Sequence, residues 1–556
     1  MAGKKKRGQT ASLRENGCGE SLRLLGDVAF FPSALGRLGD ESLLQRGGGN
    51  ADIADFAVGH ERLHTLQVHT ELALGDGGDV RADTAGFLGL TRAPNDAALH
   101  RAFAGQFTNA CHKFSFVKRA AKSISEIPGD KFFFREILRA FAARQTYLLR
   151  AFMAILKPFA ALRPQPELAA QICELPYDVM SSDEARAMAA GKPLSFLHVS
   201  KPEIDLPAGT DLYSPEVYAK GAENFQKLIS QGALKQDAKP NFYFYRQVMG
   251  QHAQVGLVAA ASCEEYLANI IKKHELTRVD KEDDRVRHIE ALNSQTGPVF
   301  LTYRAVAAFD EFVAKKISET PAVDFTGADG VRHTSWEVSS LDEIKFIEKQ
   351  FAQIPALYIA DGHHRSAAAG RVFKSRNGAG HSGQFLAVIF PHNQMQILPY
   401  NRVLKDFNGL TLAELVGKLE QVFETVRVGA ATPRRKHELG LYLDGRWHRL
   451  IFKREFTQDK NLIEGLDVTL LQQLVLAPIF GIDDPRTSKK VNFVGGIRGT
   501  TELEKLVNSG EYACAFSMFP TSIEDLMQIA DAGGIMPPKS TWFEPKLRDA
   551  MFCHLI

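Results

Sequence analysis

The stretch Tyr358-Ile-Ala-Asp361-Gly-His-His-Arg365-Ser-Ala-Ala-Ala369 joins a short apolar run to an alanine-rich run. The apolar run is typical of a buried strand, and the alanine-rich run is typical of a helix. A strand that becomes a helix within five residues leaves several backbone N–H groups unpaired at the helix start. Those N–H groups and the helix dipole attract an anion. We therefore predict a strand–turn–helix that binds a phosphate or a similar anion.

The polar residues of this turn have separate expected roles. Asp361 can cap the helix or hold a metal ion such as Mg²⁺, and Gly362 allows a tight turn and the close approach of a ligand. His363, His364 and Arg365 lie in the first helical turn, where the dipole disfavours cations, so they favour a bound anion that compensates for their charge. The alternative is a capped helix start on the surface with solvated histidines.

Length and composition narrow the class of protein. A chain of 556 residues is long enough for several domains, and a net charge of +2 gives no whole-protein field that would attract nucleic acid. The six cysteines show no C-x-x-C spacing, which favours reduced thiols and a cytoplasmic location over a disulfide framework or a zinc ribbon. No apolar run reaches the roughly 18 residues of a transmembrane helix, so we expect no membrane partner.

The chain changes character near Met153. Residues 1–152 contain glycine-rich pieces and show no strand–helix rhythm. They are either an N-terminal extension without a stable fold or the product of a mis-assigned start, with Met153 as the true first residue. We predict a core over residues 153–430 that carries the central turn, and a C-terminal α/β region over residues 431–556 that packs on this core.

Local patterns after Met153 predict a mixed α/β (α+β) fold, because strands alternate with amphipathic helices. Strands are expected at 195–199, 242–246, 250–259, 299–303 and 385–390, and a hairpin at 441–448. Helices are expected at 214–231, 264–274, 340–351, 467–480 and 523–532, the last of them capped by Thr521.

Two further stretches are rich in charge. Residues 277–288 form the densest charge run, which is either a solvated helix face or a segment that places Arg278, Arg285 and His288 beside a phosphate-binding cleft. Near the C-terminus, Met536-Pro-Pro-Lys539-Ser-Thr-Trp-Phe-Glu-Pro-Lys546 forms a rigid, aromatic loop. Its two lysines, Lys539 and Lys546, are either salt-bridge partners or ligands of an anion.

Four of these stretches resemble a known family. Pro176–Val179, Phe196–Val199, Ala360–Arg365 and Met536–Lys546 are similar to segments of the DUF1015 family of proteins of unknown function. The resemblance runs from Met153 to Ile556 and does not include residues 1–152.

The turn at Asp361–Arg365 also resembles a motif of the ParB/sulfiredoxin superfamily, in which a turn at a helix N-terminus binds nucleotide phosphates. His363 stands where sulfiredoxin has its cysteine, so repair of sulfinic acids is not expected. The free serine kinase of this superfamily has a similar Asp-Gly-His-His-Arg turn. This resemblance implies a ParB/sulfiredoxin-like core, a phosphate-bearing small-molecule ligand, and Mg²⁺ and a nucleotide as cofactors.

Together these patterns favour an enzyme that transfers a phosphoryl group to or from a small metabolite of the serine or phosphoserine type, in the kinase or the phosphatase direction. Arg365 and the helix start would bind phosphate, and Asp361 would act as base or metal ligand. The acid–base candidates are His363 and His364, with Asp178 and His198 as secondary partners.

Two alternatives belong to other classes of protein. The first is a ParB-like regulator that binds a nucleotide without catalytic turnover. The near-neutral charge and the lack of a basic recognition helix in the sequence argue against the DNA binding that such a regulator would show. A structural adaptor would leave the polar turn at Asp361–Arg365 unexplained.

Overall fold

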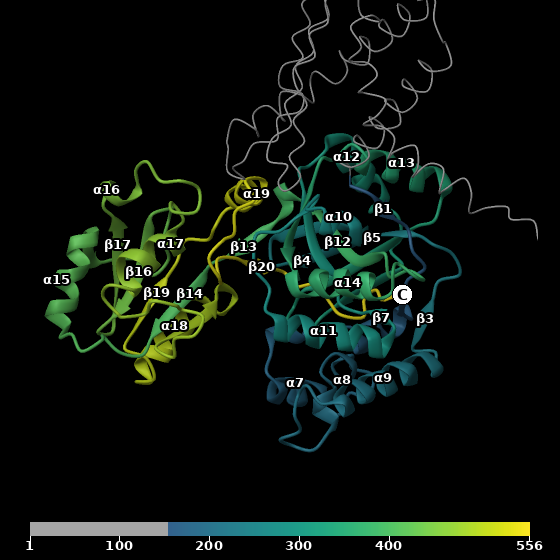
Figure 1. The fold of residues 1–556 in the computed structure, drawn as a ribbon, viewed down its shortest axis with the longest axis horizontal. Helices are drawn as coiled ribbons and strands as arrows, with labels where there is room; N and C mark the ends of the chain where they lie inside the picture. Colours follow the sequence, from purple (N-terminus) through teal and green to yellow (C-terminus); the bar gives the residue numbers. More distant parts are fainter. Residues whose placement is uncertain (1–153) are drawn as a thin grey trace, which may run out of the picture. The chain divides into compact units, whose positions relative to one another are not determined.

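The strand before the central turn, β11, belongs to a large mixed sheet, of which β4, β5 and β12 are labelled in Figure 1. A computed structural model describes residues 154–556, and within them this sheet has nine strands in the order β6-β11-β8-β12-β5-β4-β10-β9, with β1 paired to β5. The predicted mixed α/β fold is confirmed, because β8 pairs with β11 antiparallel and with β12 parallel. The strands are β1 Leu156–Lys157, β4 Phe242–Met249, β5 His252–Ser262, β6 Ile271–Lys272, β8 Val299–Tyr303, β9 Val323–Thr326, β10 Arg332–Val338, β11 Leu357–Asp361 and β12 Gln384–Pro391.

The predictions made for residues 1–152, including the start at Met153, lie outside the described residues. The described residues belong to one compact unit. Within 154–556, no helix is both long and apolar enough to cross a membrane.

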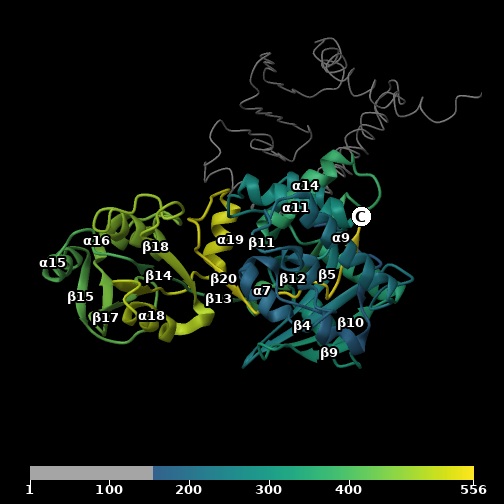
Figure 2. The same cartoon turned by 90° about the horizontal axis from the view of Figure 1, so that it is seen from below.

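Amphipathic helices accompany the large sheet. Ser181 forms a capping box with Glu184 at the start of α7, as the Ser-x-x-Glu spacing indicates. Figures 1 and 2 show α11 and α14 side by side, and this pairing brings the predicted charge run next to the central turn. The helices of this region are α6 Ala169–Ile172, α7 Ser182–Ala189, α8 Leu197–Ser200, α9 Pro215–Ser230, α10 Cys263–Leu267, α11 Val279–Leu292, α12 Ala307–Lys316, α13 Leu341–Phe351 and α14 His363–Ser375.

A second sheet follows in sequence, with the strand order β15-β17-β16-β19-β14-β18. Its β16–β17 hairpin turns through Asp444 and Gly445, both with positive φ, as the Asp-Gly pair predicts for a type I′ turn. The predicted boundary at residue 430 falls between β15 and β16, inside this sheet, which already begins with β14. The elements are β14 Tyr400–Leu404, α15 Leu412–Val422, β15 Phe423–Val428, β16 Glu438–Leu443, β17 Arg446–Phe452, α16 Arg454–Thr457, α17 Asp467–Leu471, β18 Val491–Gly495, α18 Gly499–Asn508 and β19 Cys514–Ser517.

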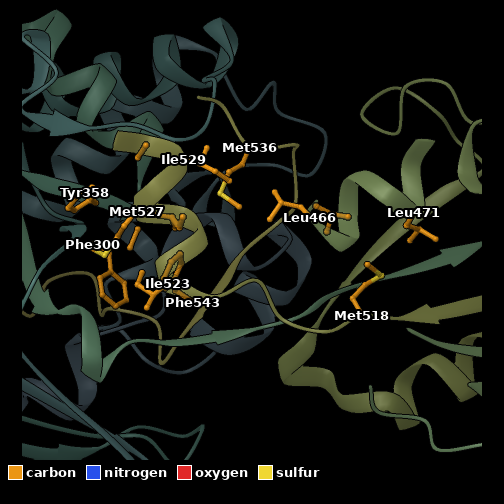
Figure 3. Close-up of a cluster of buried hydrophobic side chains, with 14 of the residues drawn as sticks. Phe300, Tyr358, Leu466, Leu471, Met518, Ile523, Met527, Ile529, Met536 and Phe543 are labelled. Atoms are coloured by element: carbon orange, nitrogen blue, oxygen red, sulfur yellow. The ribbon is translucent and has the colours of Figure 1, made fainter. Parts of the chain in front are cut away.

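The last segment of the chain returns to the first sheet through helix α19 (Ile523–Asp531). Figure 3 shows its side chains Ile523 and Met527 in one buried cluster with Phe300 and Tyr358, which belong to β8 and β11. The hydroxyl of Tyr358 also donates a hydrogen bond to Asp531 Oδ1 at 2.9 Å. This packing ties the C-terminal tail to the strand that ends at the central turn.

Among the described residues, the remaining strands form three short pairs. Strand β20 (Trp542–Glu544) pairs with β13 (Gln396–Leu398), and β21 (His554–Leu555) pairs with β7 (Ser294–Gln295). A further pair joins β2 (Leu162–Pro164) to β3 (Leu234–Gln236).

Several local predictions are wrong for identifiable reasons. The strand predicted at 195–199 is helix α8, since an apolar run this short fits either structure. The helix predicted at 264–274 ends at Leu267, because Asn269 adopts a left-handed conformation, with φ +58°, that stops helical propagation. The side-chain cap of α19 is Ser522 rather than Thr521, and the helix predicted at 467–480 contains a π-helical segment, Gln472–Leu476.

Candidate active site

The central turn has the predicted form of a strand, one glycine and a helix. Strand β11 ends at Asp361, and α14 begins at His363. Of the two roles expected for Asp361, capping the helix is wrong, because Gly362 is the N-cap, with a left-handed φ of 91°. Glycine has no side chain to accept a hydrogen bond from the helix start. The first N–H groups of α14 are therefore open to an external acceptor.

Glycine is required at position 362 for two reasons. Its φ is positive, and a Cβ added there would lie 3.2 Å from Arg365 Nε and 3.4 Å from Val299 Cα. We expect Gly362→Ala to destabilise the protein by about 2–3 kcal/mol, more than the 1–2 kcal/mol of the left-handed backbone alone. Urea denaturation measures the change.

The matched control for this change is Gly191→Ala. Gly191 has a similar φ of 73°, but a Cβ added there has nothing within 4 Å. Equal losses in the two variants would show that crowding by Arg365 and Val299 does not constrain the turn.

Asp361 is held by three donors or cations. Its Oδ2 accepts a hydrogen bond from Lys546 Nζ at 2.8 Å, and its Oδ1 accepts one from Gly362 N at 2.7 Å. Arg365 Nη2 lies 3.8 Å from Oδ1. Burial opposes ionisation, but Lys546 and Arg365 outweigh it and hold the pKa of Asp361 well below its usual value. Because both oxygens are already engaged, Mg²⁺ at Asp361 would compete with Lys546.

The guanidinium of Arg365 has a hydrogen-bond donor that no described residue satisfies. Its Nη1 donates to the backbone oxygen of Pro298 at 2.5 Å, and its Nη2 lies 4.0 Å from Asp178 Oδ2. The buried Nε has no hydrogen-bond partner among the described residues. Burial alone would lower the pKa of Arg365, but Asp178 and Asp361 raise it, so the guanidinium keeps its charge.

A cleft of about 790 Å³ opens onto the turn. Eight lysine and arginine residues line it against five aspartate and glutamate residues, and this excess of positive charge suits an anionic ligand. The predicted site residues that line the cleft are Asp178, Arg278, Arg285, His288, Asp361, Gly362, His363, His364, Arg365, Lys539 and Lys546.

His198 does not line this cleft, contrary to its predicted role as a partner in the site. On α8, its Nδ1 lies 2.7 Å from Asp205 Oδ1 and its Nε2 lies 3.2 Å from the backbone oxygen of Lys192. Since residues 197–200 are helical rather than extended, the imidazole is committed to these local partners.

The charge run was expected to be either a solvated helix face or a segment beside the cleft, and helix α11 shows features of both. Arg278 is largely exposed and pairs with Asp280 at 2.8 Å, which is typical of a solvated face. Arg285 is buried beside the cleft, where it pairs with Asp284 at 2.7 Å and lies 3.7 Å from the ring centre of Tyr177. Both arginines line the cleft, Arg285 as a buried cation and Arg278, at the N-cap of α11, as an exposed one.

Two buried histidines of the cleft are neutral at pH 7. Burial lowers the pKa of His288 to about 4, and its Nε2 hydrogen-bonds the backbone oxygen of Val199 at 3.0 Å. Burial, together with the nearby His274, lowers the pKa of His363 well below its usual value. Neither ring supplies charge for phosphate binding.

His364 has a defined tautomer in this arrangement. Its Nε2 accepts a hydrogen bond from the backbone N–H of Arg278 at 3.1 Å. Burial lowers its pKa, which favours the neutral ring. A neutral imidazole that accepts at Nε2 carries its proton on Nδ1, so His364 can donate a hydrogen bond to a ligand.

The two predicted lysines of the tail differ. Lys546 forms the ion pair with Asp361 and lies 4.6 Å from the ring centre of Trp542. Although burial lowers the pKa of Lys546, Asp361 raises it above its usual value. Lys539 has no carboxylate partner among the described residues and lies 3.4 Å from the hydroxyl of Tyr400. Lys539 thus lies exposed at the cleft, where it can contact an anion.

Sequence reasoning missed several cleft residues. His274 and Glu275 line the cleft beside His363, and Tyr400 and Trp542 provide an aromatic edge. The adjacent His274-Glu275 pair is a sequence signal for a metal site, but by itself it does not have the spacing of a known metal motif. Tyr400 lies far from the central turn in sequence, and no local pattern relates the two.

Asp549 makes stability depend on pH. It is buried, and burial raises its pKa to about 7 despite the nearby Arg365. Since an unfolded aspartate has a pKa of about 3.9, only the unfolded chain loses this proton between about pH 4 and 7. We expect this group to lower stability by up to about 1.4 kcal/mol for each pH unit in that window. Asp549→Asn should remove this slope in urea denaturation at pH 5, 6 and 7, and an unchanged slope would contradict the assignment.

No curated protein matches the sequence of this chain. A free serine kinase in complex with AMP is 14% identical with a TM-score of 0.26, and the match covers 52% of this chain and 86% of the kinase chain. SbnI from Staphylococcus aureus, with a C-terminal truncation, is 10% identical with a TM-score of 0.30, covering 52% of this chain and 85% of SbnI. A conserved hypothetical protein from Pyrococcus furiosus is 14% identical with a TM-score of 0.26, covering 53% and 93%. TM-scores in this range establish neither a shared fold nor a shared activity.

The family comparison is more decisive. The family described as Protein of unknown function (DUF1015) matches residues 156–469, which include the turn at Asp361–Arg365. The matched region ends before the loop at 536–546, although Lys546 of that loop contacts the turn. Because the match covers more than half of the chain, the protein belongs to the DUF1015 family.

Proposed function

We propose that this protein transfers a phosphoryl group between a nucleoside phosphate and a small hydroxyl metabolite of the serine type. One observation carries the proposal: the uncapped N-terminus of α14 and the buried guanidinium of Arg365 meet in a cleft that has an excess of cations. This combination is suited to a phosphate, since N–H groups and a fixed cation stabilise its non-bridging oxygens.

In this proposal, phosphate binding uses donors from two parts of the chain. The N–H groups of His363 and His364 come from the start of α14, and Arg365 adds a fixed positive charge at the same place. Lys546 reaches the same place from the C-terminal tail and is held there by Asp361. A phosphate that displaces part of the Lys546–Asp361 pairing would gain a cation and free a carboxylate oxygen.

In the proposed transfer step, one bond to phosphorus forms, another breaks, and Asp361 takes up the released proton. The hydroxyl oxygen of the metabolite forms a bond to phosphorus while the bond from phosphorus to the leaving oxygen of the nucleotide breaks. Asp361, which is ionised, accepts the hydroxyl proton, as a carboxylate does in protein kinases. His364 donates from Nδ1 to a non-bridging oxygen. The reverse sequence of bond changes returns the phosphoryl group to the nucleotide.

The aromatic edge of the cleft provides for the nucleoside. Tyr400 and Trp542 lie edge to face with ring centres 5.0 Å apart, and both line the cleft. Aromatic rings bind a nucleobase by stacking, which is favourable for any base. Mg²⁺ that enters with a nucleotide prefers oxygen ligands, and Asp178, which is partly exposed at the cleft, is a carboxylate available to it.

The test is a direct assay for transfer. Wild-type protein is incubated with Mg²⁺ and serine plus ATP or ADP, and in separate samples with phosphoserine plus ADP or AMP, and ³¹P NMR follows the phosphorus species. We expect phosphoserine to form or disappear together with the matching change in the nucleotide. Saturable nucleotide binding without transfer in any pair would reject the proposal and favour a nucleotide-binding regulator.

A further inference from the structure

A cluster of three metal-ligating side chains lines the cleft next to the central turn. His274 and Glu275 follow strand β6, and His363 is the first residue of α14. One potential ligand atom from each residue lies within 4.8 Å of the other two. All three residues line the cleft, so a bound ion would be open to a ligand there.

Both histidines have an unsatisfied ring nitrogen. His274 Nδ1 and His363 Nε2 are buried and have no hydrogen-bond partner among the described residues. The two residues are only 2% and 5% exposed, so bulk water does not solvate these atoms. A buried polar atom without a partner costs roughly 1–3 kcal/mol. His274 therefore offers an ion a buried nitrogen without a partner, whereas His363 faces Glu275 through Nδ1, the other ring nitrogen from the unpartnered Nε2.

We propose that His274, Glu275 and His363 bind a divalent transition-metal ion of the Zn²⁺, Mn²⁺, Fe²⁺ or Co²⁺ class. Two imidazoles and one carboxylate are a common set of protein ligands for such ions at sites that keep a position open. Mg²⁺ and Ca²⁺ prefer oxygen ligands, so a site with two imidazoles selects against them.

The geometry of the cluster is compatible with one shared ion. The rings of His274 and His363 are nearly perpendicular, at 89°, and their centres are 4.5 Å apart. Two imidazoles that share an ion at metal–nitrogen distances of about 2.0–2.1 Å have ring centres roughly 4.5 Å apart at a 90° ligand angle and roughly 5.2 Å apart at a tetrahedral one. His363 Nδ1 lies 3.6 Å from Glu275 Oε2, close to the roughly 3.4 Å between ligand atoms of a tetrahedral ion.

The fold also fixes the backbone of both histidines. The N–H of Met536 donates to the backbone oxygen of His274 at 2.8 Å, so the C-terminal tail holds this residue in place. Helix α14 fixes His363 at its first position. Only small side-chain rotations are then needed to close the cluster around an ion.

The experiment measures metal binding alone, without nucleotide or metabolite. The full chain is treated with chelator, and Co²⁺ is titrated while its visible absorption is recorded; Zn²⁺ is then titrated by calorimetry. We expect one Co²⁺ per chain, with an intensified absorption typical of fewer than six ligands, and displacement by Zn²⁺. His363→Gln and Glu275→Gln should each weaken binding at least about 100-fold.

Two further variants keep the test decisive. His363→Phe retains a ring that packs on His274 but removes both nitrogens, and it should abolish binding even if His363→Gln proves unstable. His198→Gln removes a histidine outside the cleft and should bind Co²⁺ like the wild type. Absence of Co²⁺ and Zn²⁺ binding to the wild type, or equal binding by all variants, would overturn the proposal. Either result leaves the phosphoryl-transfer assay unaffected.

Discussion

Replacement of Arg365 by alanine is expected to reduce the rate of phosphoryl transfer by roughly 10²–10³-fold, the usual effect of removing one donor to developing negative charge. Arg365 supplies a fixed cation with an unpaired Nε at the start of α14. Asp178 and Asp361 raise the pKa of Arg365 against the effect of burial, so the guanidinium keeps its charge in a buried position. Steady-state kinetics and circular dichroism, measured on the same preparation, separate a loss of rate from a loss of fold.

Arg371→Ala is the matched control for this prediction. Arg371 lies on the same helix, pairs with Asp283 at 2.6 Å and Glu282 at 3.3 Å, and does not line the cleft. Loss of such exposed pairs typically costs less than about 1 kcal/mol, and we expect near wild-type turnover. Full activity in Arg365→Ala would refute the assigned role of the guanidinium.

Lys546→Met is expected to destabilise the protein by about 2–3 kcal/mol near pH 7. This is below the 3–5 kcal/mol typical of a fully buried pair, because Asp361 is partly exposed. The change leaves Asp361 ionised with only Arg365 and Gly362 N close by. The pKa of Asp361 should rise towards its usual value. Since a lowered folded-state pKa stabilises the protein above the unfolded value of about 3.9, the loss should shrink as pH falls below about 4.

The double variant Lys546→Met with Asp361→Asn tests the pairing itself. Without the charge on Asp361, the missing lysine should cost less, so the two changes should be less than additive in urea denaturation. Lys436→Met removes a more exposed partner of Asp525 and should cost under about 1 kcal/mol. Additive losses would show that Lys546 and Asp361 do not depend on one another.

The central turn could be predicted from sequence because its causes are local. An apolar run, one glycine and an alanine-rich run are local signals that match β11, the left-handed Gly362 and α14. The role of Asp361 as a cap was wrong because glycine occupies the N-cap itself. Whether Asp361 points to the helix or to a lysine depends on a tail 185 residues away, which local patterns do not reveal.

The residues of the cleft could not be grouped from the sequence, because they come from distant parts of the chain. Its histidine–glutamate cluster joins residues 274 and 275 to residue 363, and its aromatic edge joins Tyr400 to Trp542. Each contribution comes from a different element, and only the packed sheets bring them together. By contrast, the apolar run of β12 and the stripe of α9 were recognisable, because their burial follows from local composition and period. The short helices α8 and α10 were not recognisable, because four or five residues do not show a helical period.

Phosphate is expected to bind at the N-terminus of α14. The most direct measurement is selective ¹⁵N-histidine labelling of the full chain, with NMR spectra recorded during titration with inorganic phosphate and with phosphoserine. We expect saturable shifts of the backbone amides of His363 and His364, and no shift of His198, which lies outside the cleft. Unchanged signals for His363 and His364 at saturating ligand, or equal shifts at all histidines, would contradict it.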